Sequence, residues 1–100
     1  MVSKVSEITI EDIARYIRLD EYEEREIETY LNIAKSYISS YTGIPIESID
    51  GESIDDFADF VIVVYILCQD MYDNRTLYVD KNNINRTVQT ILDMHTRVNL

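Results

Sequence analysis

The chain has 100 residues and a formal net charge of −10, which suits one small domain spanning residues 1–100. Two glycines and one proline offer few of the turns that successive β-hairpins need, so an all-β fold is disfavoured. The single cysteine excludes an internal disulfide, and the scarcity of Lys and Arg disfavours direct binding to a phosphate backbone.

The first predicted helix begins after Thr9, which can form a capping box with Asp12. We expect this helix to end at Leu19. Apolar residues recur along it at helical spacing, namely Ile10, Ile13 and Ile17. The segment before it has no apolar core of the signal-peptide kind, so we expect a protein of the cytosol or one released from it.

A second helix is expected to follow at once, with Asp20 as its N-cap and acidic residues in its first turn, where the helix dipole favours them. Its apolar stripe steps by four and three residues through Ile27, Leu31, Ala34, Ile38 and Tyr41. Thr42 and Gly43 should end the helix, with Gly43 in the left-handed position that follows many helices.

The third predicted helix, about residues 54–73, is apolar on almost every side and is the most unusual part of the sequence. Ser53 and Asp56 resemble another capping box, and the length favours a helix over a strand. Its unbroken apolar run, residues 60–68, is too short for the ~20 residues of a membrane span. Such a helix must be surrounded, either by its own chain or by copies of it. Cys68 lies in this run and is expected to be a small buried hydrophobe.

A fourth helix is expected from about Asn83 to Arg97, with an apolar stripe on which His95 lies. The fold class is therefore all-α, a bundle of about four helices around the apolar helix 54–73. His95 is expected to be a core residue, because a zinc site would need further histidines or a cysteine pair.

Catalytic and cofactor motifs are absent from the sequence. The two separated glycines cannot build a phosphate-binding loop, and the acidic run 20–28 lacks the glycine of a calcium-binding loop. Asp55, Asp56 and Asp59 are explained by a helix N-terminus as well as by acid–base chemistry. We therefore expect no enzymatic activity, no cofactor and no metal.

Negative charge is concentrated in the first part of the chain. Residues 1–60 hold 15 acidic and 5 basic residues, whereas residues 61–100 hold four of each. The acidic face predicted at the second helix comprises Glu21, Glu23, Glu24 and Glu28. This face is either a solvated helix start or a surface that meets a basic protein or repels passing DNA.

Four segments occur in an order that resembles a known family: ITIEDIARYIRLD, LNIAKSYISSYTGI, MYDNR and INRTVQTILDMHTRV. From about residue 8 to 98 the chain is similar to the phage head–tail connectors, the DNA-packaging-like proteins of tailed phages and prophages. The most specific parts are the Tyr-Thr-Gly at 41–43 and the Tyr-Asp-Asn-Arg at 72–75. Thr76 departs from the family, whose members often have an acidic residue there.

The resemblance implies a structural subunit of the virion, without enzymatic activity, that forms a homo-oligomeric ring of roughly a dozen copies. Such a ring links the portal protein to head-completion or tail proteins, and DNA passes through its lumen without being bound specifically. It would be located at the portal or neck of the virion and, during assembly, in the bacterial cytoplasm, with no membrane contact.

Three residues are candidate contacts with a neighbouring subunit or partner: Tyr65, Tyr72 and Arg75. Tyr and Arg are enriched among the residues that dominate interface energies. The alternative for Arg75 is a helix C-cap, where a cation is favoured by the dipole. A competing function follows from the −10 charge alone, that of an acidic regulatory or DNA-mimic protein that captures a basic partner.

Overall fold

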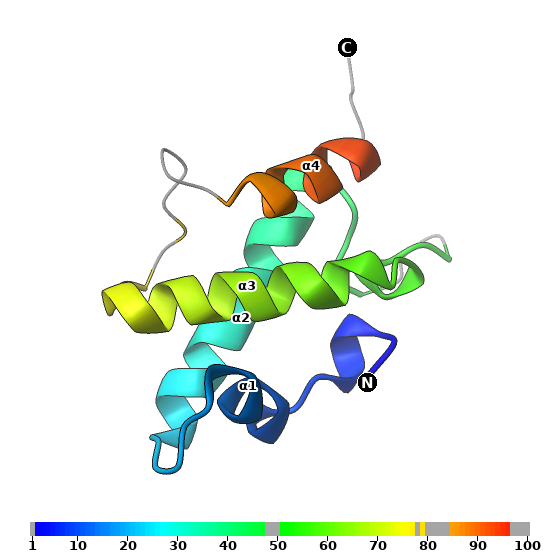
Figure 1. Cartoon of the computed structure of the whole chain (residues 1–100). Coiled ribbons are helices and arrows are strands. Elements are labelled where there is room, and N and C mark those ends of the chain that lie inside the picture. Colours follow the sequence, from blue (N-terminus) through cyan, green and yellow to red (C-terminus); the bar gives the residue numbers. More distant parts are fainter. Residues whose placement is uncertain (1, 48–50, 78, 80–84, 97–100) are drawn as a thin grey trace.

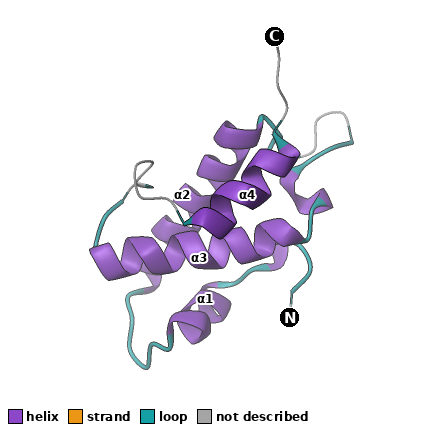
Figure 2. Cartoon of the chain, turned by 45° about the horizontal axis from the view of Figure 1, so that its top comes forward, coloured by secondary structure: helices purple, strands orange, loops and turns teal. Residues whose placement is uncertain are grey.

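The computed structural model describes residues 2–47, 51–77, 79 and 85–96, and the regular secondary structure in these ranges is entirely helical (Figures 1 and 2). Four α-helices are present: α1 (Ile10–Ile17), α2 (Glu24–Thr42), α3 (Asp59–Asn74) and α4 (Arg86–His95). Two short 3₁₀ turns, η1 (Val5–Glu7) and η2 (Ile54–Asp56), precede α1 and α3. The predicted all-α bundle of four helices is confirmed.

Helix α3 occupies the centre of the molecule and crosses α2, its most extensive contact (Figure 1). Helices α1 and α4 lie on opposite sides of α3 (Figure 1). All four helices contribute to one apolar core, whose largest fully buried side chains include Ile13, Ile27, Ile38, Phe60, Leu67 and Leu92. The fold therefore packs three amphipathic helices around one that is apolar on most sides.

The N-terminus of α1 forms as predicted. The Thr9 hydroxyl accepts from the backbone N–H of Asp12 at 3.1 Å, and the Asp12 carboxylate accepts from the N–H of Thr9 at 2.9 Å. The helix ends at Ile17, two residues before the predicted Leu19. Arg18 follows in the left-handed conformation at φ 67°, and the Leu19 N–H bonds back to the carbonyl of Ala14.

The predicted start of α2 at Asp20 is wrong, because the helix begins at Glu24. Residues 19–23 instead connect the two helices, and Leu19 and Tyr22 pack against the core from this connection. Of the acidic residues expected in the first turn, only Glu24 is there. The predicted end is confirmed: Gly43 takes φ 79° and its N–H bonds to the carbonyl of Ser39 at 2.8 Å.

Helix α3 begins at Asp59, five residues after the predicted start at 54. The Ser53–Asp56 capping box exists, but it caps η2, and extended Phe57 separates this 3₁₀ turn from α3. Its own chain covers much of α3, because seven of its 16 residues are fully buried: Phe60, Val61, Val63, Val64, Leu67, Cys68 and Met71. In the part of the chain that the structure describes, no helix is long and apolar enough to cross a membrane.

Helix α4 is shorter than predicted and is capped by Asn85, whose side-chain oxygen accepts from the N–H groups of Thr87 and Val88. The predicted boundary residues Asn83 and Arg97 lie outside the described residues. His95 is half-buried where α4 packs against α3, so it lies at the edge of the core rather than inside it as predicted. Its Nε2 lies 2.9 Å from a carboxylate oxygen of Asp59.

Cys68 is fully buried in α3, as predicted, and burial raises the pKa of its thiol to about 12. Because the thiolate is the reactive form, we expect a disulfide reagent at pH 8 to leave the folded protein unmodified. The same reagent should modify the chain within minutes in denaturant. A time course followed by mass spectrometry checks this, and equal rates in both conditions would contradict it.

Tyr41 links α2 to α4, because its hydroxyl donates to the carboxylate of Asp93. This bond, followed by burial and the Asp93 charge, raises the pKa of Tyr41 from 10.0 to about 12. Between these values the folded protein keeps a proton that the unfolded chain loses. The free energy of unfolding should therefore fall as the pH rises from 10 to 12.

Tyr41→Phe should make this alkaline decline shallower, since the variant lacks the phenol that titrates differently in the two states. Denaturant titrations at several pH values measure the slopes. Parallel declines of the two proteins would show that Tyr41 contributes nothing to the pH dependence.

Candidate functional site

The end of α3 and the beginning of α2 meet in a cluster of four side chains, Glu26, Tyr30, Tyr72 and Arg75. Arg75 Nη1 lies 2.7 Å from Glu26 Oε2, and the Tyr30 hydroxyl donates to the same oxygen at 2.9 Å. The Arg75 guanidinium also lies 4.3 Å from the centre of the Tyr72 ring. The Tyr72 and Tyr30 rings meet edge to face, with centroids 6.4 Å apart. The Glu26 carboxylate of α2 thus contacts both Tyr30 on its own helix and Arg75 at the end of α3.

The local sequence produces this geometry through the way α3 ends. Arg75 takes the left-handed conformation at φ 51°, and its N–H and that of Thr76 bond to the carbonyls of Tyr72 and Met71. Asn74 adds a side-chain bond to the carbonyl of Asp70 at 2.8 Å. The YDNR segment is therefore the C-cap of α3, and the cap residue itself reaches α2.

The cluster is electrostatically coupled. The hydrogen bond with Glu26, and then its negative charge, raise the pKa of Arg75. Burial, and then the bond to Glu26, raise the pKa of Tyr30. Because the Arg75 side chain is largely exposed, solvent screens the ion pair, and its contribution to the stability of the fold is small.

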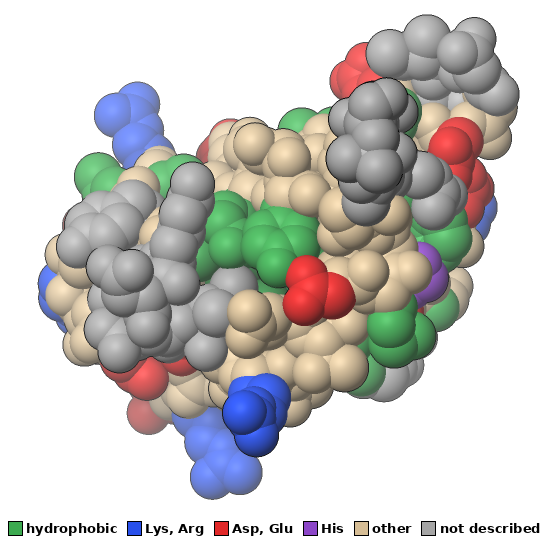
Figure 3. Space-filling model, turned by 90° about the horizontal axis from the view of Figure 1, so that it is seen from above, with side chains coloured by type: hydrophobic (Ala, Val, Ile, Leu, Met, Phe, Trp, Pro, Cys, Tyr) green, Lys and Arg blue, Asp and Glu red, His purple; other side chains and the backbone are tan. Residues whose placement is uncertain are grey.

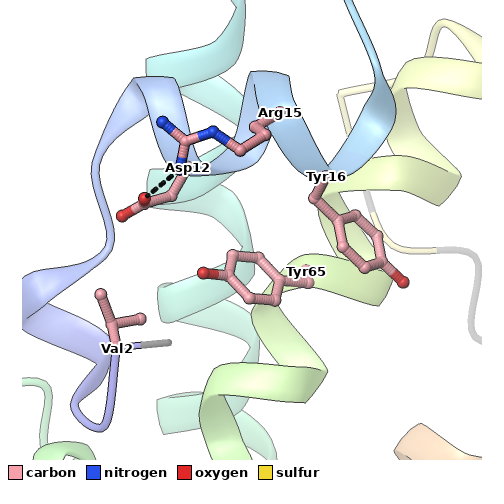
Figure 4. A pocket seen from close by; sticks show the side chains of 5 residues that line it. All are labelled: Val2, Asp12, Arg15, Tyr16 and Tyr65. Carbon is pink, nitrogen blue, oxygen red and sulfur yellow. Dashed lines mark ion pairs between the residues drawn. The ribbon is translucent and has the colours of Figure 1, made fainter.

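The structure brings Tyr72 and Arg75 together, two of the three predicted interface residues, but it leaves Tyr65 elsewhere. Tyr65 stacks on Tyr16 of α1, with ring centroids 5.0 Å apart and planes 14° from parallel. Both line a hollow of about 470 Å³ that Val2, Asp12 and Arg15 complete (Figure 4). Figure 4 shows the Tyr65 hydroxyl on the side of this hollow facing Val2 and Asp12. Burial, and then the Asp12 charge, raise the pKa of Tyr65.

The four predicted acidic residues are all exposed, but they do not form one turn of a helix. Glu21 and Glu23 lie in the connection before α2, and Glu24 and Glu28 lie one turn apart on the helix. Sequence reasoning missed Glu26, the half-buried acid of this run. Its role depends on Arg75, 49 residues away, and no local pattern indicates that pairing.

The aspartates of η2 and of the first turn of α3 have partners within the chain. Asp55 accepts from the N–H of Ser6 at 2.8 Å, Asp56 accepts from the N–H of Ser53 at 3.0 Å, and Asp59 pairs with His95. Among the described residues, no group of three or more His, Cys, Asp or Glu side chains is arranged to hold a metal ion. Each of these three aspartates thus has a partner within the chain.

The chain has no significant match among protein-family models, curated proteins or solved structures.

Proposed function

We propose that this protein is a structural subunit of a phage virion, a ring-forming connector that links the portal to head-completion or tail proteins. The order of the four sequence segments and the all-α bundle of four helices support this proposal. In such a ring, DNA passes through the lumen and is not bound specifically.

The observation that carries the proposal is that one small subunit exposes both a group of carboxylates and several large apolar side chains. The exposed carboxylates are Glu21, Glu23, Glu24 and Glu28. The apolar side chains include Leu77 after α3 and Met94 on α4, which are 64% and 68% exposed and lie toward opposite ends of α3. Figure 3, which views the molecule from above, shows a small group of hydrophobic side chains in the middle of this face and further ones nearer its edges. A head-to-tail ring needs two different patches on each subunit that are complementary to each other, so the carboxylates would meet a basic or polar region and the apolar side chains a second apolar region.

The ring is tested by measuring mass in solution at increasing protein concentration, alone and with portal protein, followed by imaging of the assemblies. We expect rings, and we expect the double variant Leu77→Ser, Met94→Ser to abolish them while remaining folded. Ile46→Ser is the matched control, because Ile46 is also an exposed large hydrophobe but lies in the loop after α2. If the unmodified protein, the double variant and Ile46→Ser all formed rings equally well, Leu77 and Met94 would not be part of the contact between subunits.

The competing function predicts a different result in the same experiment. An acidic decoy would remain small when portal protein is added and would compete with DNA for a basic protein. If a solved ring placed Glu21, Glu23, Glu24 and Glu28 on the outer rim and lined the channel with Arg and Lys, the acidic face would not repel passing DNA.

Arg75→Ala tests whether the helix-end cluster is an anchor between subunits. Because Arg75 already pairs with Glu26 in its own subunit, we expect the variant to form rings and to lose a small amount of stability. Ring assays combined with urea denaturation measure both effects. Loss of rings by a folded variant would instead make Arg75 an intersubunit contact.

A further inference from the structure

A groove follows the side of α3 that faces away from α2, between α1 and the N-terminal segment. It consists of two hollows of about 470 and 390 Å³ that share Val2 as a wall. Tyr16 and Tyr65 line the first, and Ala58 and Ile62 line the second. We call this surface, defined by these five residues, the α3 groove.

The floor of the α3 groove is apolar and well supported. Ala58, Ile62 and Tyr65 are spaced by four and three residues, so they lie in one row along α3. At ~1.5 Å per residue this row is about 10 Å long, close to two turns of a helix. Tyr16 and Ile62 are nevertheless 43% and 42% exposed. The groove therefore offers apolar surface that the subunit itself does not cover.

Its walls are fixed by the core and by a hydrogen bond. Val5 and Ile8 of the N-terminal segment are buried in the core, and the Ser6 N–H donates to Asp55 at 2.8 Å. The Tyr16–Tyr65 stack holds α1 against α3 at the other end. Because these contacts exist without any ligand, a partner would meet a groove that is already formed, at a low entropic cost.

The surroundings of the groove are acidic. The charged residues that line the two hollows are Asp12, Asp59 and Arg15. The same segments, residues 2–16 and 55–65, add the exposed carboxylates Glu7, Glu11 and Asp56 but only one further basic side chain, Lys4. Arg15 is paired with Asp12 at 3.6 Å, which leaves the negative charge dominant. A complementary ligand must combine apolar side chains for the floor with positive charge for the rim.

We propose that the α3 groove is a docking site for a basic amphipathic helix of another protein, with two apolar anchors about one turn apart. Recognition of such a helix in a groove uses apolar side chains at i and i+3 or i+4, which matches the two adjoining hollows. A second copy of this chain fits poorly, because no described helix carries more Lys and Arg than Asp and Glu. The proposal does not depend on ring formation.

The test uses a labelled synthetic helical peptide with leucines at i and i+4 and lysines at its other surface positions. Fluorescence anisotropy measures its binding to the full chain. We expect Ile62→Ser to weaken binding by about tenfold, since it removes an aliphatic side chain from the contact. Ile46→Ser, at an exposed large hydrophobe that lines neither hollow, is the matched control and should change the affinity by less than about twofold.

The same peptide with glutamates in place of the lysines should bind far more weakly, because it places negative charge against the acidic rim. The proposal is overturned if Ile62→Ser binds the lysine peptide as tightly as the unmodified protein does, or if both peptides bind alike. It is also overturned if Ile62→Ser abolishes self-association and neither peptide binds, since the groove would then accept a second copy. Circular dichroism of each variant confirms that the helices are intact.

Discussion

Replacing Phe60 with alanine should lower the free energy of unfolding by about 3–5 kcal/mol. Phe60 is fully buried in α3, and its ring centroid lies 5.4 Å from that of Phe57 and 5.0 Å from that of His95. Truncation removes apolar contacts and leaves a cavity at the junction of α3 and α4. Because small domains are stable by only ~5–15 kcal/mol, the variant should lose a large part of its stability. Urea denaturation followed by circular dichroism measures it.

Ile62→Ala is the matched control for Phe60, because it truncates a large apolar residue in the same helix, two positions away. Ile62 is 42% exposed, so we expect a loss below about 1 kcal/mol. Similar losses for both variants would mean that Ile62 is also buried in solution, either in the core or against another molecule.

Thr42→Val should lower the free energy of unfolding by about 1–3 kcal/mol, although it barely changes the shape of the side chain. Thr42 is fully buried at the end of α2. Its hydroxyl donates to the carbonyl of Ile38 at 2.7 Å and accepts from the N–H of Ile44 at 3.2 Å. Valine can do neither, so the Ile44 N–H loses this acceptor in a place that water does not reach.

Thr29→Val tests the same chemistry at an exposed site of the same helix. The Thr29 hydroxyl donates to the carbonyl of Arg25 at 2.8 Å, but water can replace it there. We expect a change within about 0.5 kcal/mol. Equal effects at Thr42 and Thr29 would show that the intrinsic preference of valine for other backbone conformations, rather than burial, decides the loss.

The helices themselves were largely predictable, because the signals that form them are local. The Thr9–Asp12 capping box, the stripe of α2 and the Gly43 C-cap depend on residues within a few positions of each other, and all three predictions are confirmed. The starts of α2 and α3 were predicted too early. At each start an acidic cap pattern was present, but a connection or a 3₁₀ turn occupied the residues that follow it.

The site could be predicted only in part. Tyr72 and Arg75 were identified from the helix end that they form, but their partners Glu26 and Tyr30 lie on another helix. Likewise, Tyr65 was identified without Tyr16, on which it stacks. In each case the partner residue is distant in the sequence. The two residues meet only because the helices that carry them cross in the folded structure.

The sequence by itself determined the helical class, the apolar character of α3 and the uneven distribution of charge, because composition and periodicity express these directly. Only the tertiary structure decided which side of α3 stays uncovered. Helices α1, α2 and α4, together with η1, pack against α3, and seven of its residues are buried while Ile62 stays 42% exposed. An all-round apolar helix has no intrinsic outer face, so the directions from which its neighbours pack determine where that face lies.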